Sequence, residues 1–312
     1  MIFDVATFVV AFVIALVLYP GLIRGLQRLK AGQVIQQELP ESHQRKAGTP
    51  TGGGVLFVLV AIVGGLLATL AGHYGAIPSM AGLVAGGTIG LADDRNKLRV
   101  GTRGIPARLK FPIQLLLAIP VAWLATVQGQ QEHFLPVTPW LIYPLAVLAI
   151  VATSNAVNIT DGMDGLAAGL SIIAIGSMVL LIPGATAGEK AVAMSLCGAL
   201  LAFLVFNRHP ARVFMGDTGA LAVGFALAAM AIQQGVLLLL PLVALVFVLE
   251  TLSVIIQVAY FKASGGRRVF TMTPIHYTFQ HEGWTENRIA LSFWGAGVVS
   301  ALAAVALVKL FS

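Results

Sequence analysis

Long apolar stretches, separated by short polar segments, dominate the chain. A transmembrane helix needs about 20 mostly apolar residues, and about 17 can be enough. The stretches that meet this requirement are residues 3–23, 53–72, 76–92, 110–128, 139–156, 165–183, 190–207, 218–233, 235–260 and 289–310. The pattern therefore predicts an all-α, polytopic integral membrane protein with ten transmembrane helices. The ninth stretch is longer than a span needs, so we expect it to tilt or bend.

Composition excludes a soluble globular protein. Apolar and aromatic residues supply 58% of the 312 residues and charged residues only 10%, whereas about 25% charged residues is usual in soluble domains. Disorder is excluded as well, because disordered segments combine low hydrophobicity with high charge. A single cysteine, Cys197, permits no intrachain disulfide and argues against Cys-based metal sites.

The placement of the basic residues predicts which loops face the cytoplasm, where Lys and Arg of membrane proteins collect. With ten spans, every basic residue except Lys190 and Lys309 falls on one side. We therefore expect both termini on the outer side and a single transmembrane domain over residues 1–312. The cytoplasmic loops are then residues 24–52, 93–110, 155–165, 207–217 and 261–288. The net charge of +6 is explained by these loops, and no nucleic-acid partner is expected.

Five acids lie at predicted cytoplasmic helix ends in Gly- and Asn-rich sequence: Asp93, Asp94, Asp161, Asp164 and Asp217. Asp93 and Asp94 close the third span in GLADDRNKL, where adjacent carboxylates repel and the helix dipole disfavours negative charge. Neutralisation by Arg95 and Lys97 at a solvated helix end is the alternative to a functional pair. The remaining loop acids are interpreted as solvated: Asp4, Glu38, Glu41, Glu132, Glu189, Glu282 and Glu286.

The segment NAVNITDGMDGLAAG, residues 155–169, carries polar residues at every third position: Asn155, Asn158, Asp161 and Asp164. On a helical turn they would share one side, and Gly162 and Gly165 permit tight turns. Amide and carboxylate oxygens at this spacing suit magnesium or the hydroxyls and amides of a nucleotide. An ordinary inter-helix turn explains two Asp-Gly pairs and two asparagines poorly.

Two further segments favour phosphate binding. In FNRHPARVFMGDTGAL, residues 206–221, Asp217 precedes a helix and could cap it, while helix N-terminal amides suit a phosphate. Phe214 either stacks on a base or packs in the core, and Asn207 adds polar reach. In KAGTPTGGG, residues 46–54, Lys46 and Thr51 accompany a glycine run, although the spacing is not that of a Walker A loop.

Titratable residues also occur near the last cytoplasmic loop. His276 and His281 of TPIHYTFQHEGW are either solvated or serve in acid/base chemistry or phosphate contacts opposite the acids. Glu250 lies inside the ninth span, where an ionisable group marks function by default. The interpretation that the residues favour is a neutral carboxyl hydrogen-bonded to Ser253 or Gln257.

Carboxylates, amides, lysines and histidines on one face of a membrane protein indicate magnesium-assisted phosphoryl transfer, in which positioning and electrostatics supply most of the catalysis. A site at the membrane surface implies one soluble and one lipid substrate. The rival class is a transporter of magnesium or an organic anion. A transporter would place polar residues near the bilayer midplane, often with inverted repeats, and the sequence has neither apart from Glu250.

Five motifs in collinear order, between about residues 28 and 294, resemble those of the polyprenyl-phosphate N-acetylhexosamine-1-phosphate transferase superfamily. They are ESHQRKAGTPTGGG, GLADDRNKL, NAVNITDGMDGLAAG, FNRHPARVFMGDTGAL and PIHYTFQHEGW. The ESH segment with its GTPT run is similar to the muramoyl-pentapeptide branch of that superfamily. A UDP-N-acetylglucosamine-1-phosphate transferase is the alternative within it.

The resemblance implies a catalytic domain in the bacterial plasma membrane that needs Mg²⁺ and faces the cytoplasm. Its substrates would be UDP-N-acetylmuramoyl-pentapeptide and undecaprenyl phosphate, and its products lipid I, a peptidoglycan precursor, and UMP. By motif position, Asp217 and Asn155 would hold magnesium and Asp93 would deprotonate the lipid phosphate, with Asp94 and His276 also catalytic. Substrate would contact Lys46, Thr51, Lys97, Lys110, Asn158, Asp161, Asp164, Asn207 and Phe214.

The chain departs from the motifs of that branch at a few positions. Tyr277 and Thr278 replace the second and third residues of a triple histidine, and Gly52 replaces a methionine. His276 is therefore the only histidine of the triplet carried over. Because the lipid tail must stay in the bilayer, we expect a groove open to lipid near spans 139–156 and 235–260. Gly and Ala in the spans are compatible with close helix contacts, including those of a homodimer.

Overall fold

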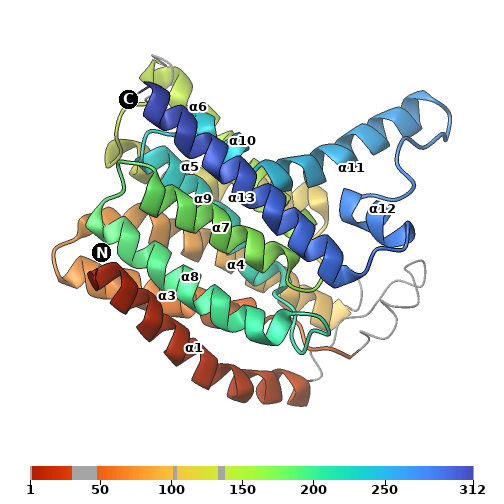
Figure 1. Cartoon of the computed structure of the whole chain (residues 1–312), viewed down its shortest axis with the longest axis horizontal. Coiled ribbons are helices and arrows are strands. Elements are labelled where there is room, and N and C mark those ends of the chain that lie inside the picture. Colours follow the sequence, from red (N-terminus) through yellow and green to blue (C-terminus); the bar gives the residue numbers. More distant parts are fainter. Residues whose placement is uncertain (1, 30–47, 101–103, 133–137, 312) are drawn as a thin grey trace.

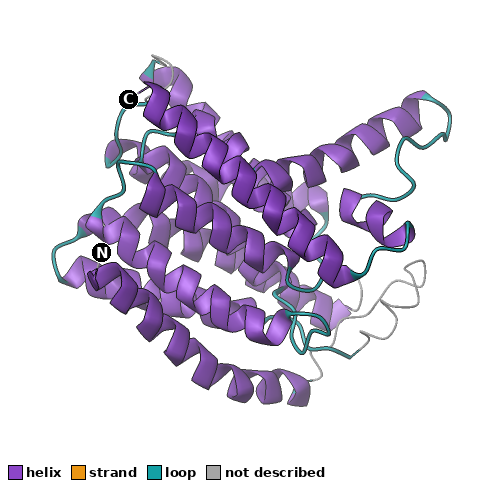
Figure 2. Cartoon of the chain, viewed as in Figure 1, coloured by secondary structure: helices purple, strands orange, loops and turns teal. Residues whose placement is uncertain are grey.

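The computed structural model describes residues 2–29, 48–100, 104–132 and 138–311, and these ranges contain helices and loops but no β-strand (Figures 1 and 2). The long helices are α1 (Ile2–Arg28), α3 (Gly54–Leu70), α4 (Ile77–Val100), α5 (Ala107–Val127), α6 (Pro139–Thr160), α7 (Leu166–Leu181), α8 (Ala187–Asn207), α9 (Gly216–Gln233), α11 (Leu245–Ala263) and α13 (Glu286–Phe311). The short ones are η1 (Tyr74–Ala76), η2 (Leu237–Leu239), α10 (Leu240–Val243) and α12 (Ile275–His281).

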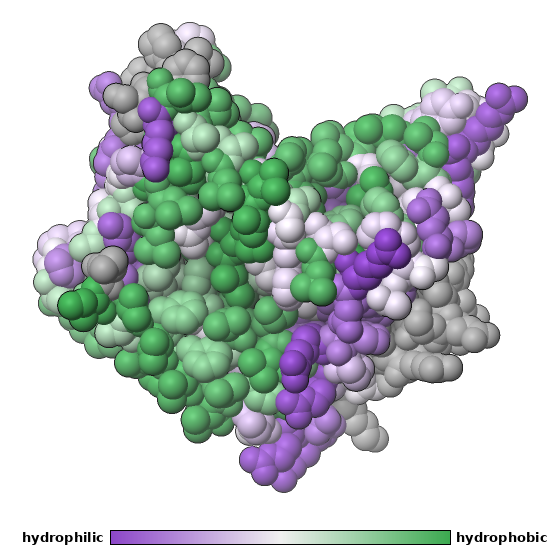
Figure 3. All heavy atoms as spheres, viewed as in Figure 1, coloured by the Kyte–Doolittle hydropathy of each residue, from purple (hydrophilic) through white to green (hydrophobic). Residues whose placement is uncertain are grey.

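The all-helical membrane architecture predicted from the sequence is confirmed. In the described residues, 8 helices are long and apolar enough to cross a membrane, and α3 and α7 are shorter apolar helices. Apolar side chains cover the middle of the face drawn in Figure 3, with hydrophilic residues gathered toward its ends. Both termini lie at the same end of the bundle (Figure 1). The count of ten spans and the side on which the termini lie stay predictions.

The predicted ninth span is not one continuous helix, so the boundaries 235–260 were wrong while the expected bend is confirmed. The chain forms η2, then α10, and breaks at Ala244 before α11 begins. Pro241 in the first turn of α10 has no N–H to bond back to η2, which separates these two short helices. Beyond the break, α11 leans away from the bundle (Figure 1).

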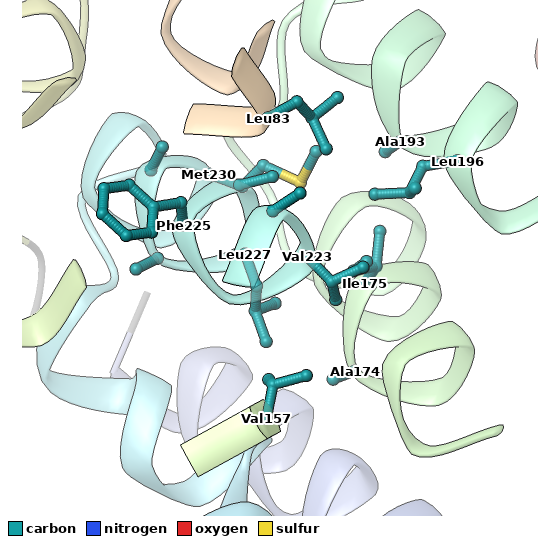
Figure 4. Packing of buried hydrophobic residues seen from close by; sticks show 14 of the residues in the cluster. Leu83, Val157, Ala174, Ile175, Ala193, Leu196, Val223, Phe225, Leu227 and Met230 are labelled. Atoms are coloured by element: carbon teal, nitrogen blue, oxygen red, sulfur yellow. The ribbon is translucent and has the colours of Figure 1, made fainter. Parts of the chain in front are cut away.

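Helix α9 is the centre of the bundle, because 94% of its apolar stretch, Gly216–Gln233, is buried inside the protein. In Figure 4 its side chains Val223, Leu227 and Met230 lie among residues from surrounding helices. These neighbours include Leu83 of α4, Val157 of α6, Ala174 and Ile175 of α7, and Ala193 and Leu196 of α8. The first turn of α9 carries Asp217, so the central helix brings one predicted site residue to the end of the bundle.

Glycines allow α4 to approach α9 at backbone contact. Gly82, Gly86 and Gly90 follow one another at four-residue spacing and share one face of α4. A Cβ atom on Gly90 would collide with the carbonyl group of Asp217, and one on Gly86 with that of Leu221. Asp94 is the next residue in this series, so the same face ends in a carboxylate at the first turn of α9.

A buried polar cluster lies at the opposite end of α8 and α9. Glu189 forms a capping box with Thr186 at the start of α8, and its Oε1 accepts a hydrogen bond of 2.5 Å from Gln234 Nε2. The side chain of Glu189 is fully buried. The prediction that Glu189 is merely solvated is therefore wrong, because a helix cap and a buried amide satisfy its carboxylate.

We predict that Gly90→Ala destabilises the protein by about 1–3 kcal/mol, the usual cost of overpacking, because the added methyl group must push α4 away from α9. Thermal unfolding in detergent would measure this as a lower Tm. Gly87→Ala is the matched control, because a Cβ there meets its nearest neighbours at 3.5 and 3.8 Å, ordinary contact distances. Equal Tm values for the two variants would contradict the close contact.

Candidate active site

Four charged side chains from three helices meet at one end of the bundle, and we call them the acid–lysine cluster: Asp93 and Lys97 of α4, Lys110 of α5 and Asp217 of α9. Lys97 Nζ lies 2.8 Å from Asp93 Oδ2 and 2.7 Å from Asp217 Oδ1. Lys110 Nζ contacts Asp217 Oδ2 and lies 3.8 Å from Asp93 Oδ1. Two ammonium groups thus bridge two carboxylates, which offsets the repulsion between the acids in this buried position.

Asp93 is held from both sides. It is only 2% exposed, and its Oδ1 accepts a hydrogen bond of 2.8 Å from the backbone N–H of Ile105. Gly104 lies against the carboxylate, since a Cβ there would come within 2.5 Å of Asp93 Oδ2. The prediction that Asp93 and Asp94 end the helix is wrong, because α4 continues to Val100. The pairing of Asp93 with Lys97 one turn later favours this extension.

Asp94 anchors the N-terminus of α9. Its Oδ1 accepts a hydrogen bond of 3.0 Å from the backbone N–H of Asp217, and its Oδ2 accepts bonds from the N–H and Oγ1 of Thr218 at 3.0 and 2.6 Å. Negative charge is favourable at the N-terminus of a helix, where backbone N–H groups lack partners. Asp217 was predicted as the candidate cap. The structure gives that role to Asp94 and places Asp217 inside the first turn.

Asn155 on α6 lies beside a buried residue that sequence reasoning missed. Its Nδ2 donates to Gln114 Oε1 at 3.0 Å and to the carbonyl of Val151 at 2.8 Å. Gln114 is 1% exposed and lies one helical turn after Lys110 on α5. A buried glutamine one turn from a lysine in an otherwise apolar span was a usable signal. Gln114 therefore joins α6 to the helix that carries Lys110, one turn before it.

The polar residues at every third position of 155–164 were predicted to share one side of a helix, and only the two asparagines lie in a helix. Helix α6 ends at Thr160, so Asn155 and Asn158 are helical while Asp161 and Asp164 lie beyond the helix. Desolvation raises the pKa of the Asp161 carboxyl well above its ordinary value, and the charges of Asp217 and Asp94 raise it further. Asp161 is therefore within electrostatic reach of Asp217 and Asp94.

Asp164 belongs to a neighbouring group of polar residues. Its Oδ2 accepts a hydrogen bond of 3.0 Å from the N–H of Ala211 and lies 2.9 Å from His209 Nδ1. Glu286 Oε2 lies 3.6 Å from the same nitrogen, and the side chain is buried, so its prediction as a solvated loop acid is wrong. The ligand atoms of these three residues lie within 4.8 Å of one another.

Asn207 joins two loops at the site. Its Oδ1 accepts a hydrogen bond of 3.0 Å from the N–H of Gly165, and its Nδ2 donates to the carbonyl of Val213 at 2.9 Å. Both polar atoms of the side chain are therefore engaged with backbone. Together with Asp164, Asn207 fixes the turn after α6 against the loop before α9.

The GTPT segment pairs with the loop before α9. An isolated parallel bridge joins Thr51 and Phe214, with Phe214 N donating to the Pro50 carbonyl at 2.8 Å and Gly53 N to the Phe214 carbonyl at 2.9 Å. This pairing brings two predicted substrate contacts together, and the Phe214 side chain stays half-exposed. Lys46 lies outside the described residues.

His276 is fully buried on α12, and its Nδ1 lies 3.0 Å from Oε2 of the equally buried Glu250. The predicted partners of Glu250 were wrong. Ser253 Oγ donates to the backbone carbonyl of Glu250, and Gln257 Oε1 accepts from the N–H groups of Val269 and Phe270. A buried carboxylate needs a strong donor, and the imidazole of α12 supplies one. His281 is exposed at the end of α12.

An apolar cavity of about 270 Å³ opens between α6 and the broken helix α10–α11. Its lining includes Leu145, Ala149, Thr153, Leu240, Phe247 and Thr251. The cavity lies between the two spans where the sequence predicted a groove for lipid. The break at Ala244 belongs to its wall, so the bend of the predicted ninth span shapes this cavity.

Comparison with known proteins identifies the class to which this fold and site belong. Residues 76–235, which include the acid–lysine cluster and the turn after α6, match the family "Glycosyl transferase family 4". The curated phospho-N-acetylmuramoyl-pentapeptide-transferase of Heliobacterium modesticaldum is 43% identical over 310 residues, 96% of each chain. Those of Moorella thermoacetica and Halalkalibacterium halodurans are 43% and 40% identical, covering 97% and 96% of this chain and 98% and 95% of theirs. The chain therefore belongs to the phospho-N-acetylmuramoyl-pentapeptide transferase family.

We predict that Asp94→Ala lowers the Tm more than Asp93→Asn does. The first change removes three hydrogen bonds at the start of α9, and losing a helix cap alone costs about 0.5–2 kcal/mol. Thr218→Val removes only one of these bonds and should fall between Asp94→Ala and the unmodified protein in thermal unfolding. A Tm for Asp94→Ala equal to that of the unmodified protein would contradict the anchoring role.

Proposed function

We propose that the protein transfers phospho-N-acetylmuramoyl-pentapeptide from its UDP conjugate to undecaprenyl phosphate, giving lipid I and UMP. An oxygen of the lipid phosphate attacks the sugar-bearing phosphorus, and the bond from that phosphorus to the bridging oxygen breaks as UMP leaves. The acid–lysine cluster is the observation that carries this proposal, because it gathers groups that handle protons and phosphate charge at one end of a membrane bundle. The relatives that match the whole chain carry the name of this transferase.

Asp93 is the proposed base for the lipid phosphate. Its carboxylate is buried, held by Ile105 N–H, and adjacent to both lysines. In the substrate complex, Lys97 and Lys110 would neutralise phosphate oxygens, as cations do in phosphoryl transfer. Asp94 acts through the position of Asp217, because its hydrogen bonds fix the first turn of α9.

The donor set fits a magnesium ion. Both carboxylate oxygens of Asp217 contact ammonium groups, so a magnesium ion would replace these lysine contacts when the lysines turn to substrate phosphate. Oxygen ligands such as carboxylates and amides suit this hard cation, and Asp217 with Asn155 are the residues that would hold it. Bound magnesium supplies charge stabilisation on the diphosphate. Gln114 orients Asn155 through both polar atoms of the amide, accepting from Nδ2 at 3.0 Å and donating to Oδ1 at 3.5 Å, and this amide oxygen is the atom that would turn to the metal.

The nucleotide pocket is proposed on the loops around the cluster. Phe214 would stack on uracil from a backbone fixed by the bridge to Thr51. Asp161 is within electrostatic reach of the cluster, and Asn207 and Asp164 hold the turn after α6 in place. The remaining contacts are assigned by motif position to Lys46 and Asn158. His276 faces the turn at Gly162 and is proposed as a further catalytic residue.

The prenyl tail is proposed to lie in the apolar cavity between α6 and α10–α11. This cavity leads from the bilayer region toward the end of α6, where the polar turn begins. Its apolar lining suits hydrocarbon, and its place beside the site lets a lipid phosphate meet a soluble nucleotide. The proposal puts this end of the bundle in the cytoplasm, both termini outside, and ten spans in the bacterial plasma membrane, compatible with a homodimer.

The substrate is tested by incubating the purified protein with magnesium, undecaprenyl phosphate and one nucleotide sugar at a time. We expect UMP release with UDP-N-acetylmuramoyl-pentapeptide and none after a chelator removes the metal. Release only with UDP-N-acetylglucosamine would replace the proposal with the other branch of the superfamily. Asp93→Asn and Asp217→Asn serve as controls, since each should fold and yet lose turnover. Near-normal UMP release by either variant removes that residue from the mechanism.

We predict that Ala149→Trp raises the KM for undecaprenyl phosphate at least severalfold while leaving the KM for the nucleotide sugar unchanged. The indole would fill space between α6 and α11 that the prenyl tail needs. Leu148→Trp, the neighbouring residue that is 56% exposed, is the matched control and should behave like the unmodified enzyme. Parallel changes in both KM values for Ala149→Trp would place the lipid elsewhere.

A further inference from the structure

A carboxylate and an imidazole are paired in the interior where α11 meets α12. Glu250 and His276 are both fully buried, and the distance between Glu250 Oε2 and His276 Nδ1 is 3.0 Å. Removing two titratable groups from water is costly unless each satisfies the other. The motif-based role of His276 does not account for Glu250. The free-energy cost of burying such a pair indicates a role in which the carboxylate acts on the imidazole.

The pairing determines which nitrogen of His276 is presented to the site. In a neutral imidazole one ring nitrogen carries the proton and the other accepts. A carboxylate at Nδ1 fixes the proton there, and thereby sets the state and direction of Nε2. Nε2 is buried and has no hydrogen-bond partner among the described residues. A Cβ atom added to Gly162 would lie 2.8 Å from Nε2, so this nitrogen faces the turn after Asp161.

Tyr277 holds the same turn from the adjacent position on α12. Its hydroxyl donates a hydrogen bond of 3.0 Å to the Gly162 carbonyl, and its ring lies 4.2 Å from that of His276. Burial raises the pKa of the Tyr277 hydroxyl, and the charges of Glu286, Asp161 and Glu250 raise it further, so the group stays a proton donor. The residue that departs from the triple-histidine motif thus fastens α12 to the turn that carries Asp161.

We propose that Glu250 is a positioning residue, which holds His276 with Nδ1 protonated and Nε2 turned to the Asp161–Gly162 turn to accept a hydrogen bond from the nucleotide-sugar substrate. The inference rests on the proposed function for the reaction itself. Glu250 lies on the same helix as Phe247 and Thr251, which line the apolar cavity. One helix therefore contributes both the wall of the lipid cavity and the group that orients an imidazole toward the nucleotide loop.

The test compares Glu250→Gln with the unmodified protein, using ¹⁵N-histidine NMR and UMP release. The unmodified protein should show a His276 ring with Nε2 unprotonated, assigned by the signal lost in His276→Gln. A neutral amide no longer holds the proton at Nδ1, so the variant should gain signal from the tautomer protonated at Nε2. Its kcat should fall about 10- to 100-fold, as for other groups that orient a functional histidine, with little change in the KM for nucleotide sugar.

Glu189→Gln is the matched control, because it makes the same substitution at an equally buried glutamate at the other end of the bundle. Its kcat and His276 spectrum should equal those of the unmodified protein. Turnover of Glu250→Gln at the control rate, or an Nε2-protonated His276 in the unmodified protein, would overturn the proposal. The second measurement needs no variant and no turnover. Failure of the proposed function would instead appear as no UMP release by the unmodified protein, whatever its histidine spectrum.

Discussion

The contact between α4 and α9 fixes the position of every charge in the acid–lysine cluster. Glycines bring the two backbones together, and the same helical face then ends in Asp94, whose carboxylate binds the first N–H groups of α9. Helix packing and helix capping are thus one continuous interaction. Asp217 cannot shift along its axis without breaking these bonds, and Lys97 three residues after Asp94 is brought to it by the same helix.

Charge balance explains why such a site can exist at the end of an apolar bundle. Two carboxylates close to one another in a poorly solvated position would raise the free energy of the folded protein. Lys97 and Lys110 come from different helices and each contacts both acids, so the cluster is neutral before any substrate binds. A substrate phosphate can take over the ammonium groups, and a cation can take over the carboxylates, without a net change in buried charge.

The sequence predicted the helices and the polar segments between them well, because hydrophobicity and charge can be read from each residue. It failed where a long-range partner decides the outcome. The cap of α9 was expected from Asp217, whereas the carboxylate that binds its first N–H groups belongs to Asp94, more than 120 residues away. Glu189 and Glu286 looked like loop acids because their partners, Gln234 and His209, are distant in the chain. Gln114 was overlooked, although its spacing from Lys110 could have exposed it.

The break in the ninth apolar stretch affects both the apolar cavity and the Glu250–His276 pair. The apolar cavity lies between α6 and this broken stretch, and Ala244 itself belongs to the lining. Because the helix stops at Ala244 and resumes at a new angle, the apolar cavity stays open while Glu250, two turns farther on, still reaches α12. The same bend thus borders the apolar cavity and carries a carboxylate to the histidine that faces the Asp161–Gly162 turn. An enzyme that transfers a phospho-sugar from a nucleotide to a lipid needs both surfaces side by side, and α11 contributes to both in one helix.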